Sequence, residues 1–219
     1  MFAFPCRDYI QASCYGPTLN FAMATIDWWQ DHTGDPKAQV HFEVENRGHV
    51  QLTRNHIAQI AVQAQADYVC WMDDDAIPFS PWVNDLAKHD KDAIVPAFFQ
   101  REPPYQCPNR VFADSVPGGV YVNPFPRRLH QIDATGFHAV LMKGKVIQGV
   151  WEATKGNPFG HVKEDLYFWE QAKALGFELW CDSSHEVGHL GTRVVDGQYF
   201  LAAKHAAEGY EKKPRIVRA

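Results

Sequence analysis

The sequence has no apolar run that approaches the roughly 20 residues that a membrane-spanning helix needs. No signal peptide is predicted either, because the opening segment MFAFPCRDYI turns polar after a few residues. Cysteine is scarce, and the five cysteines, odd in number and without a CxxC pair, favour reduced and buried thiols over a disulfide framework. These absences predict a soluble, cytoplasmic protein without a transmembrane segment.

An excess of positive charge is also absent. The formal net charge is -5 at pH 7, whereas a non-specific nucleic-acid binder usually carries a basic face. The basic residues that gather between 204 and 218 are interpreted as a solvated tail. With 219 residues, of which 46% are hydrophobic, the chain is large enough for one globular domain with a substantial core.

Strand and helix patterns alternate along most of the chain. Buried strands are predicted at 1–5, 38–46, 67–72, 93–99 and 177–182, and helices at 17–32, 50–66, 80–90 and 164–176. This alternation predicts an α/β fold with a central, mostly parallel sheet flanked by helices. The proline- and glycine-rich segment 102–128 interrupts the alternation and is interpreted as a long loop with a hairpin at 118–123.

The segment DSSHEVGHLG contains a formal match to the HExxH pattern of zinc proteases, with His185, Glu186 and His189 at the fixed positions. A zinc protease needs this motif on a helix, because only helical i, i+4 spacing turns both imidazoles toward one metal ion. Here the motif directly follows a predicted strand and contains a glycine. A zinc metallohydrolase, with Glu208 as a third ligand, is therefore kept as an alternative only.

Three consecutive aspartates, Asp73, Asp74 and Asp75, follow the apolar segment 67–72. Ligands of open α/β sheets bind at the carboxyl ends of strands, which is where these side chains fall. Adjacent carboxylates repel one another unless a cation neutralises them, and hard oxygen ligands suit Mg²⁺ or Mn²⁺. An acidic turn that caps the following helix is the competing interpretation.

Five segments of the chain resemble GT-A glycosyltransferases and occur in the same order as in that family. ADYVCWMDDDAIPF is similar to their hydrophobic strand and DxD motif, and FAFPCRDYI to their first strand and nucleotide-binding loop. ATGFHAVLMKG resembles the acceptor-side segment, and KEDLYFWEQAKALGFEL with VGHLG resembles the later block that ends in a metal-binding histidine. The resemblance implies a single GT-A (Rossmann-like) domain over 1–219, with a nucleotide-sugar-binding half (1–100), an acceptor-side half (101–200) and a C-terminal tail (201–219).

The resemblance also implies a metal site. Asp73, Asp75 and His189 would bind Mn²⁺ or Mg²⁺, which in turn binds the two phosphates of the donor. His185 and Glu186 would then lie on an approach loop and take no part. The implied donor-binding residues are Pro5, Cys6, Arg7, Arg54, Asp73 and Asp74.

The acidic pair Glu164 and Asp165 matches the position whose carboxylate acts as the base in inverting members of the family. Asp165 would deprotonate the acceptor hydroxyl, although an acidic pair at a helix start also suits the helix dipole. Thr135 and Gly136 would lie near the donor sugar and the acceptor. For Arg54, a surface salt bridge with a glutamate of the strand at 38–46 is the competing interpretation.

The implied activity is metal-dependent transfer of a sugar from a UDP- or GDP-sugar to an acceptor hydroxyl, with inversion favoured. The acceptor stays open between a protein, a glycan, a lipid-linked sugar, a small molecule and a modified nucleobase. Besides the zinc metallohydrolase, the alternatives are a non-catalytic nucleotide-sugar-binding module and a nucleotidyltransferase. The nucleotidyltransferase would be expected to carry a glycine-rich, basic loop after the first strand, and PCRDYIQASCYG is a poor match.

Overall fold

The computed structural model describes residues 1–5, 12–34, 41–45, 49–102, 104–113, 116–160, 163–191 and 194–207. The first half contains β1 (Phe2–Pro5), α1 (Ala12–Thr33), β2 (Phe42–Glu45), α2 (Val50–Gln63), β3 (Tyr68–Met72), β4 (Ala76–Pro78), α3 (Trp82–Ala87) and β5 (Ala93–Ala97). The second half contains β6 (Arg110–Ala113), β7 (Val116–Tyr121), β8 (Leu129–Ile132), β9 (Ala139–Lys143), α4 (Gly144–Ala153), α5 (Glu164–Ala174), β10 (Leu179–Leu190), β11 (Val194–Val195) and α6 (Gly197–Ala207). The interpretations that concern Cys6, Arg7 and Glu208 lie outside the described residues.

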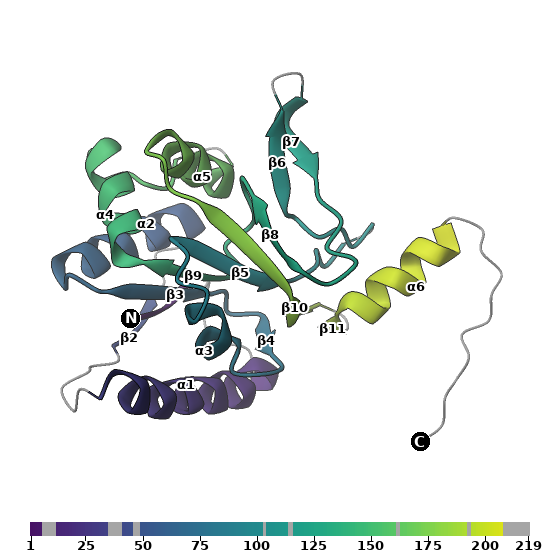
Figure 1. The fold of residues 1–219 in the computed structure, drawn as a ribbon, viewed down its shortest axis with the longest axis horizontal. Helices are drawn as coiled ribbons and strands as arrows, with labels where there is room; N and C mark the ends of the chain where they lie inside the picture. Colours follow the sequence, from purple (N-terminus) through teal and green to yellow (C-terminus); the bar gives the residue numbers. More distant parts are fainter. Residues whose placement is uncertain are drawn as a thin grey trace.

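A central sheet in the order β11-β10-β5-β9-β3-β1-β2 organises the chain (Figure 1). β1 is parallel to both β2 and β3, and β10 is parallel to β5. β9 lies between β3 and β5 and is antiparallel to both, so these two strands run in the same direction. The predicted fold, α/β with a central, mostly parallel sheet flanked by helices, is confirmed.

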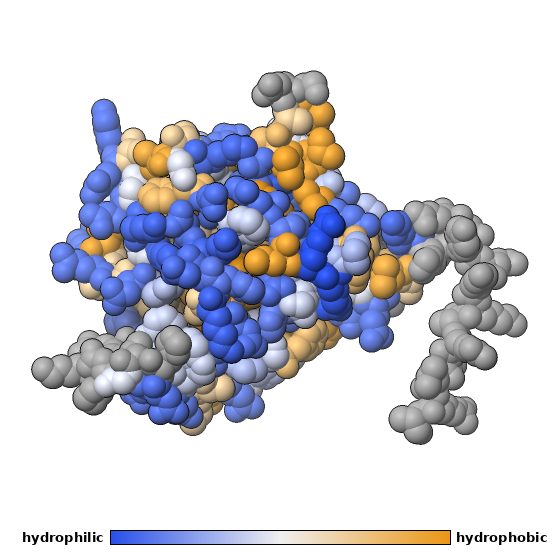
Figure 2. Space-filling model, in the orientation of Figure 1, coloured by the Kyte–Doolittle hydropathy of each residue, from blue (hydrophilic) through white to orange (hydrophobic). Residues whose placement is uncertain are grey.

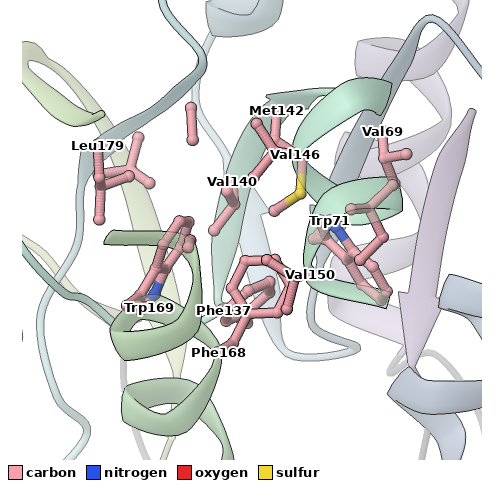
Figure 3. Close-up of a cluster of buried hydrophobic side chains, with 14 of the residues drawn as sticks. Val69, Trp71, Phe137, Val140, Met142, Val146, Val150, Phe168, Trp169 and Leu179 are labelled. Carbon is pink, nitrogen blue, oxygen red and sulfur yellow. The ribbon is translucent and has the colours of Figure 1, made fainter. Parts of the chain in front are cut away.

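Helices cover both faces of this sheet. On one face, α2, α4 and α5 pack over the alternate side chains of β3, β5, β9 and β10 (Figure 3). On the other face, α1 and α3 pack over the side chains that point the opposite way. In β3, Val69 and Trp71 belong to the first cluster and Cys70 and Met72 to the second. This burial on both faces is why the segment is apolar without interruption.

The structure also shows whether a described helix could span a membrane and where the first helix begins. Among the described residues, no helix combines the length and the hydropathy that crossing a bilayer requires.

The predicted start of the first helix at Pro17 is wrong, because α1 begins at residue 12 and contains this proline. Proline is favoured in a first turn, and that preference misplaced the boundary, since a helix tolerates an interior proline at the cost of one backbone hydrogen bond.

The segment 102–128 is more regular than the sequence predicts. β6 and β7 form a separate two-stranded sheet, in which Val111 lies opposite Val120. The predicted hairpin is present, but it is formed by β6 and β7, and Gly118 and Gly119 lie inside β7 and not in its turn. Gly119 has a φ of +80°, and a Cβ there would lie 2.7 Å from the carbonyl oxygen of Val111. This pair of glycines therefore permits a close strand approach instead of a turn.

One face of this hairpin is apolar and open to solvent. Val111, Val116 and Val120 are exposed, and Figure 2 shows the hydrophobic residues gathered on the hairpin, which stands out from the body in Figure 1. Phe112 points the other way and packs against the core. The alternation of the strand thus places a hydrophobic residue on each side, and only one side is covered.

The first residue of α4 lies in close backbone contact with the turn that follows α2. The Gly144 amide donates to the Asp67 carbonyl at 2.7 Å, and a Cβ on Gly144 would lie 1.7 Å from the Ala66 carbonyl oxygen. We expect Gly144→Ala to lower the free energy of unfolding by about 3 kcal/mol, because the backbone must shift to admit the methyl group. Gly16→Ala is the matched control, since nothing lies within 4 Å of its Cβ position on α1.

The control should raise the free energy of unfolding by about 0.5–1 kcal/mol, as alanine does in an exposed helix. Urea unfolding followed by circular dichroism measures both changes. Equal effects of the two substitutions would show that the contact at Gly144 is not a packing constraint.

Candidate functional site

Strand ends bring two aspartates and two histidines together at the carboxyl edge of the sheet. Asp73 follows β3, Asp75 precedes β4, His138 precedes β9 and His189 lies in β10. The Asp73 amide donates to the His138 carbonyl at 3.0 Å, and the Leu190 amide donates to the Asp75 carbonyl at 2.9 Å. β4 pairs with β10, which fixes the register between the aspartate turn and His189. The backbone therefore sets the positions of all four side chains.

Each histidine uses one ring nitrogen to bond a backbone carbonyl. His138 Nε2 lies 3.1 Å from the Gly188 oxygen, and His189 Nδ1 lies 2.9 Å from the Phe99 oxygen. A carbonyl oxygen only accepts, so these two nitrogens donate. In the neutral rings, His138 Nδ1 and His189 Nε2 then carry lone pairs, which is how metal-binding imidazoles are oriented by their surroundings.

Both of these nitrogens face Asp75. His189 Nε2 lies 3.2 Å from Asp75 Oδ2, and His138 Nδ1 lies 3.5 Å from Asp75 Oδ1 and 3.8 Å from Asp73 Oδ2. His138 Nδ1 is buried without a hydrogen-bond partner. One ligand atom from each of Asp75, His138 and His189 lies within 4.8 Å of the others, and ligands about 2.1 Å from one ion are typically separated by about 3–4 Å. This cluster fits a divalent cation.

The charges in the cluster reinforce one another. Burial works to raise the pKa of Asp75, but His189 and His138 outweigh it and hold the pKa below its usual value. Burial likewise works against the charged form of His138, yet Asp73 and Asp75 raise its pKa. The pKa of Asp73 falls to about 2, because Arg54 and His138 together outweigh the effect of burial. The aspartates are therefore ionised and attract positive charge.

The structure brings together two of the three predicted metal ligands, Asp75 and His189, and adds a third residue that the sequence interpretation missed. Asp73 lies at the edge of the cluster, where its Oδ1 accepts from Arg54. His138 is 2% exposed and sits at the start of an apolar strand. The histidine in ATGFHAVLM was the available signal, but a lone histidine in an apolar segment is more often a core residue.

A buried arginine joins the aspartate turn to α5. Arg54, on α2, is 3% exposed and donates to Asp73 Oδ1 at 3.0 Å, Asp165 Oδ1 at 2.5 Å and Glu164 Oε1 at 3.3 Å. Its guanidinium also lies over the ring of Phe137 at 5.3 Å. The interpretation of Arg54 as a surface salt bridge is wrong, since the α5 and β3 carboxylates surround it in the interior. Its predicted contact with the donor stays a prediction.

Asp165 has an unusual environment for a carboxylate. Burial raises its pKa to about 6, Arg54 opposes this rise, and the negative charge of Glu164 adds to it. Protein surrounds the carboxyl group, while 30% of the side chain stays open to solvent. An ideal Cβ on Gly136 would lie 3.7 Å from Asp165 Oδ2, so this predicted acceptor-side residue does adjoin the carboxylate. A carboxylate of this kind can accept a proton near neutral pH.

Thr135, by contrast, points into the interior. Its hydroxyl donates to Asn109 Oδ1 at 2.8 Å, and its carbonyl accepts from Trp169 Nε1 at 2.8 Å. Thr135 is 2% exposed. These bonds tie the segment before β9 to α5 and to the residue before β6. A contact of Thr135 with substrate stays a prediction.

The HExxH match lies in strand β10 and not on the approach loop that the sequence predicted. His185 Nε2 lies 3.9 Å from Asp85, whereas His189 faces Asp75. Glu186 accepts from Arg127 at 2.8 Å and from the first backbone amide of α6 at 2.5 Å. The helical arrangement that a zinc protease needs is therefore absent from this segment, whose residues are all described.

The other predicted donor-binding residues lie near the same edge of the sheet or outside the described chain. Pro5 ends β1 and is buried, and Asp74 is half-buried in the turn between β3 and β4. Cys6 and Arg7 are outside the described residues. Their roles stay predictions.

Two solved structures share this fold. A197 from STIV is similar with a TM-score of 0.56 and 14% identity, over 87% of this chain and 85% of A197. A structure of GalNAc-T7 with UDP, GalNAc and Mn²⁺ is similar with a TM-score of 0.50 and 10% identity, over 87% of this chain and 43% of that chain. No family model and no curated protein matches the sequence. At these identities the similarity shows the GT-A-like fold alone.

The raised pKa of Asp165 predicts a stability cost near neutral pH. Between pH 3.8 and about 6, the folded protein keeps a proton on Asp165 that the unfolded chain has released. This group therefore lowers the free energy of unfolding as pH rises through that interval. We expect Asp165→Asn to raise the free energy of unfolding at pH 7.5 by about 1–2 kcal/mol, reduced from the value for a fully buried group because water reaches the side chain.

The gain should disappear at pH 3.5, where the wild-type side chain is neutral as well. Chemical denaturation at a series of pH values measures the difference. A variant less stable than wild type at pH 7.5 would contradict the raised pKa.

Proposed function

We propose that the protein is a metal-dependent glycosyltransferase, which transfers a sugar from a UDP- or GDP-sugar to an acceptor hydroxyl. The proposal rests mainly on the cluster of Asp75, His138 and His189, in which one ring nitrogen of each histidine faces the same carboxylate. The cluster lies where ligands of open α/β sheets bind. Asp75, His138 and His189 would hold Mn²⁺ or Mg²⁺, which neutralises negative charge on a leaving diphosphate.

Asp165 is proposed as the base. Its pKa near 6 lets it hold no proton at neutral pH and still accept one from an acceptor hydroxyl as that oxygen attacks the sugar. Arg54 and Glu164 fix its position, because the arginine bonds both carboxylates from the interior side. Gly136 lies beside this base, because a Cβ there would be 3.7 Å from Asp165 Oδ2 and 3.5 Å from the Phe98 ring. A base that acts directly on the acceptor favours inversion.

The shared fold supports the donor class. GalNAc-T7, in a structure with UDP, GalNAc and Mn²⁺, has the same fold over 87% of this chain. By analogy, the half of the chain up to residue 100, with Pro5, Cys6, Arg7 and Asp74, would bind the nucleotide-sugar. The half from 101 to 200 would then receive the acceptor.

A catalyst explains the site better than a module that only binds a nucleotide-sugar. Binding alone does not require a carboxylate that is partly desolvated beside another carboxylate, and such groups lower stability. The geometry of Asp165 and Glu164 next to Arg54 therefore favours an enzyme.

The metal-binding proposal predicts that nucleotide binding needs a divalent cation. We expect UDP or GDP to raise the melting temperature only with Mn²⁺ or Mg²⁺, since the ion links the phosphates to the protein. His138→Ala should abolish this shift, because it removes one ligand. His185→Ala is the matched control within the same chain and should keep the full shift, as His185 lies beside Asp85 and away from the cluster.

Thermal unfolding with each ion, with and without each nucleotide, measures these effects. Stabilisation by Zn²⁺ alone, with an equal loss in His185→Ala and His189→Ala and no effect of nucleotides, would overturn the proposal in favour of a zinc hydrolase.

A further inference from the structure

Arg101 brings a positive charge to the cluster of candidate metal ligands Asp75, His138 and His189. Its Nη1 donates to Asp75 Oδ2 at 2.8 Å, and the same oxygen lies 3.2 Å from His189 Nε2. The two partners differ in exposure, because 46% of the Arg101 side chain is open to solvent and only 9% of the Asp75 side chain is. The guanidinium thus reaches the carboxylate from the solvent side.

The backbone of Arg101 is held close to the site. Phe99, two residues earlier, is fully buried, and its carbonyl orients His189. The Gln100 amide donates to the Gln106 carbonyl at 3.0 Å, which closes the following turn. A fixed backbone with an exposed, long side chain lets the charged group change partners without any change in the fold.

Arg101 differs in this respect from the other arginine of the site. Arg54 is buried and bonds three carboxylates, so its charge belongs permanently to the interior. Arg101 bonds one carboxylate oxygen, and that oxygen is one that a metal ion between Asp75 and His189 would use. A guanidinium and a divalent ion on one oxygen repel each other, so the two cations compete for Asp75.

We propose that Arg101 is a placeholder cation that neutralises Asp75 before the metal ion binds and afterwards binds the diphosphate of the nucleotide. This inference rests on the proposed function, because it needs both the ion and a nucleoside diphosphate. The released guanidinium stays beside the cluster, where its paired N–H groups match phosphate oxygens. A nucleoside diphosphate also carries more negative charge than one divalent ion neutralises. Metal therefore binds first, and its binding prepares Arg101 for the nucleotide.

Arg101→Gln separates the two roles, because it is predicted to change two affinities in opposite directions. Without nucleotide, Mn²⁺ titrated by electron paramagnetic resonance should bind about threefold or more tightly than to wild type, since the competing charge is gone. With saturating Mn²⁺, UDP or GDP measured by calorimetry should bind about tenfold more weakly, since a charge-assisted contact is lost. Uridine or guanosine, which lack phosphates, should show no difference between variant and wild type.

Two further variants serve as controls. Arg128→Gln removes the same charge from an exposed arginine whose described contacts come from its backbone, and it should alter neither affinity. Arg101→Lys keeps the charge, so its Mn²⁺ affinity should stay close to that of wild type. Circular dichroism spectra of the variants identify any that is misfolded.

An unchanged or weaker Mn²⁺ affinity of Arg101→Gln would overturn the placeholder role, and an unchanged UDP and GDP affinity would overturn the phosphate-binding role. Both results would leave the metal site itself intact. If wild type binds no Mn²⁺ at all, the proposed function fails instead, so the two failures are distinguishable.

Discussion

The ion pairs of Arg54 hold together the part of the molecule on which the site depends. One guanidinium, buried on α2, bonds Asp73 at the end of β3 and the acidic pair Glu164 and Asp165 at the start of α5. Three elements that are distant in sequence therefore meet at one charge. Without this cation the three half-buried carboxylates would repel one another and would lose these hydrogen bonds.

The two arginines of the site differ in how firmly the protein holds them. Arg54 is in the interior and bonds three carboxylates. On the other side of the aspartate turn, Arg101 bonds Asp75 from the solvent side, where a metal ion held by Asp75, His138 and His189 would replace it. Burial strengthens the interactions of Arg54, whereas Arg101 is half open to solvent. Arg54 positions Asp165. Release of Arg101 from Asp75 would make that carboxylate available to an ion and the guanidinium available to a phosphate.

Local patterns predicted the sheet and the aspartate turn, because β3 is apolar on both faces and an acidic cluster at its end is visible in the sequence itself. The sequence did not predict the partners of Arg54, which lie 110 and 111 positions away at Glu164 and Asp165. Only the tertiary fold decides such pairings. The position of His138 beside Asp75 could not be predicted for the same reason. A lone histidine in an apolar segment forms no sequence motif with its distant partners. β10 extends through the HExxH segment, because its pairing with β4 and β5 outweighs the low strand propensity of the glycine in that segment.

The most direct test of the metal site is an anomalous difference map from crystals grown with Mn²⁺ and UDP or GDP. We expect one peak at about 2.0–2.3 Å from a carboxylate oxygen of Asp75, from His138 Nδ1 and from His189 Nε2, with nucleotide phosphate completing the coordination. A peak shared by His185 and His189, or a nucleotide bound without any peak at Asp75, would contradict the site described above.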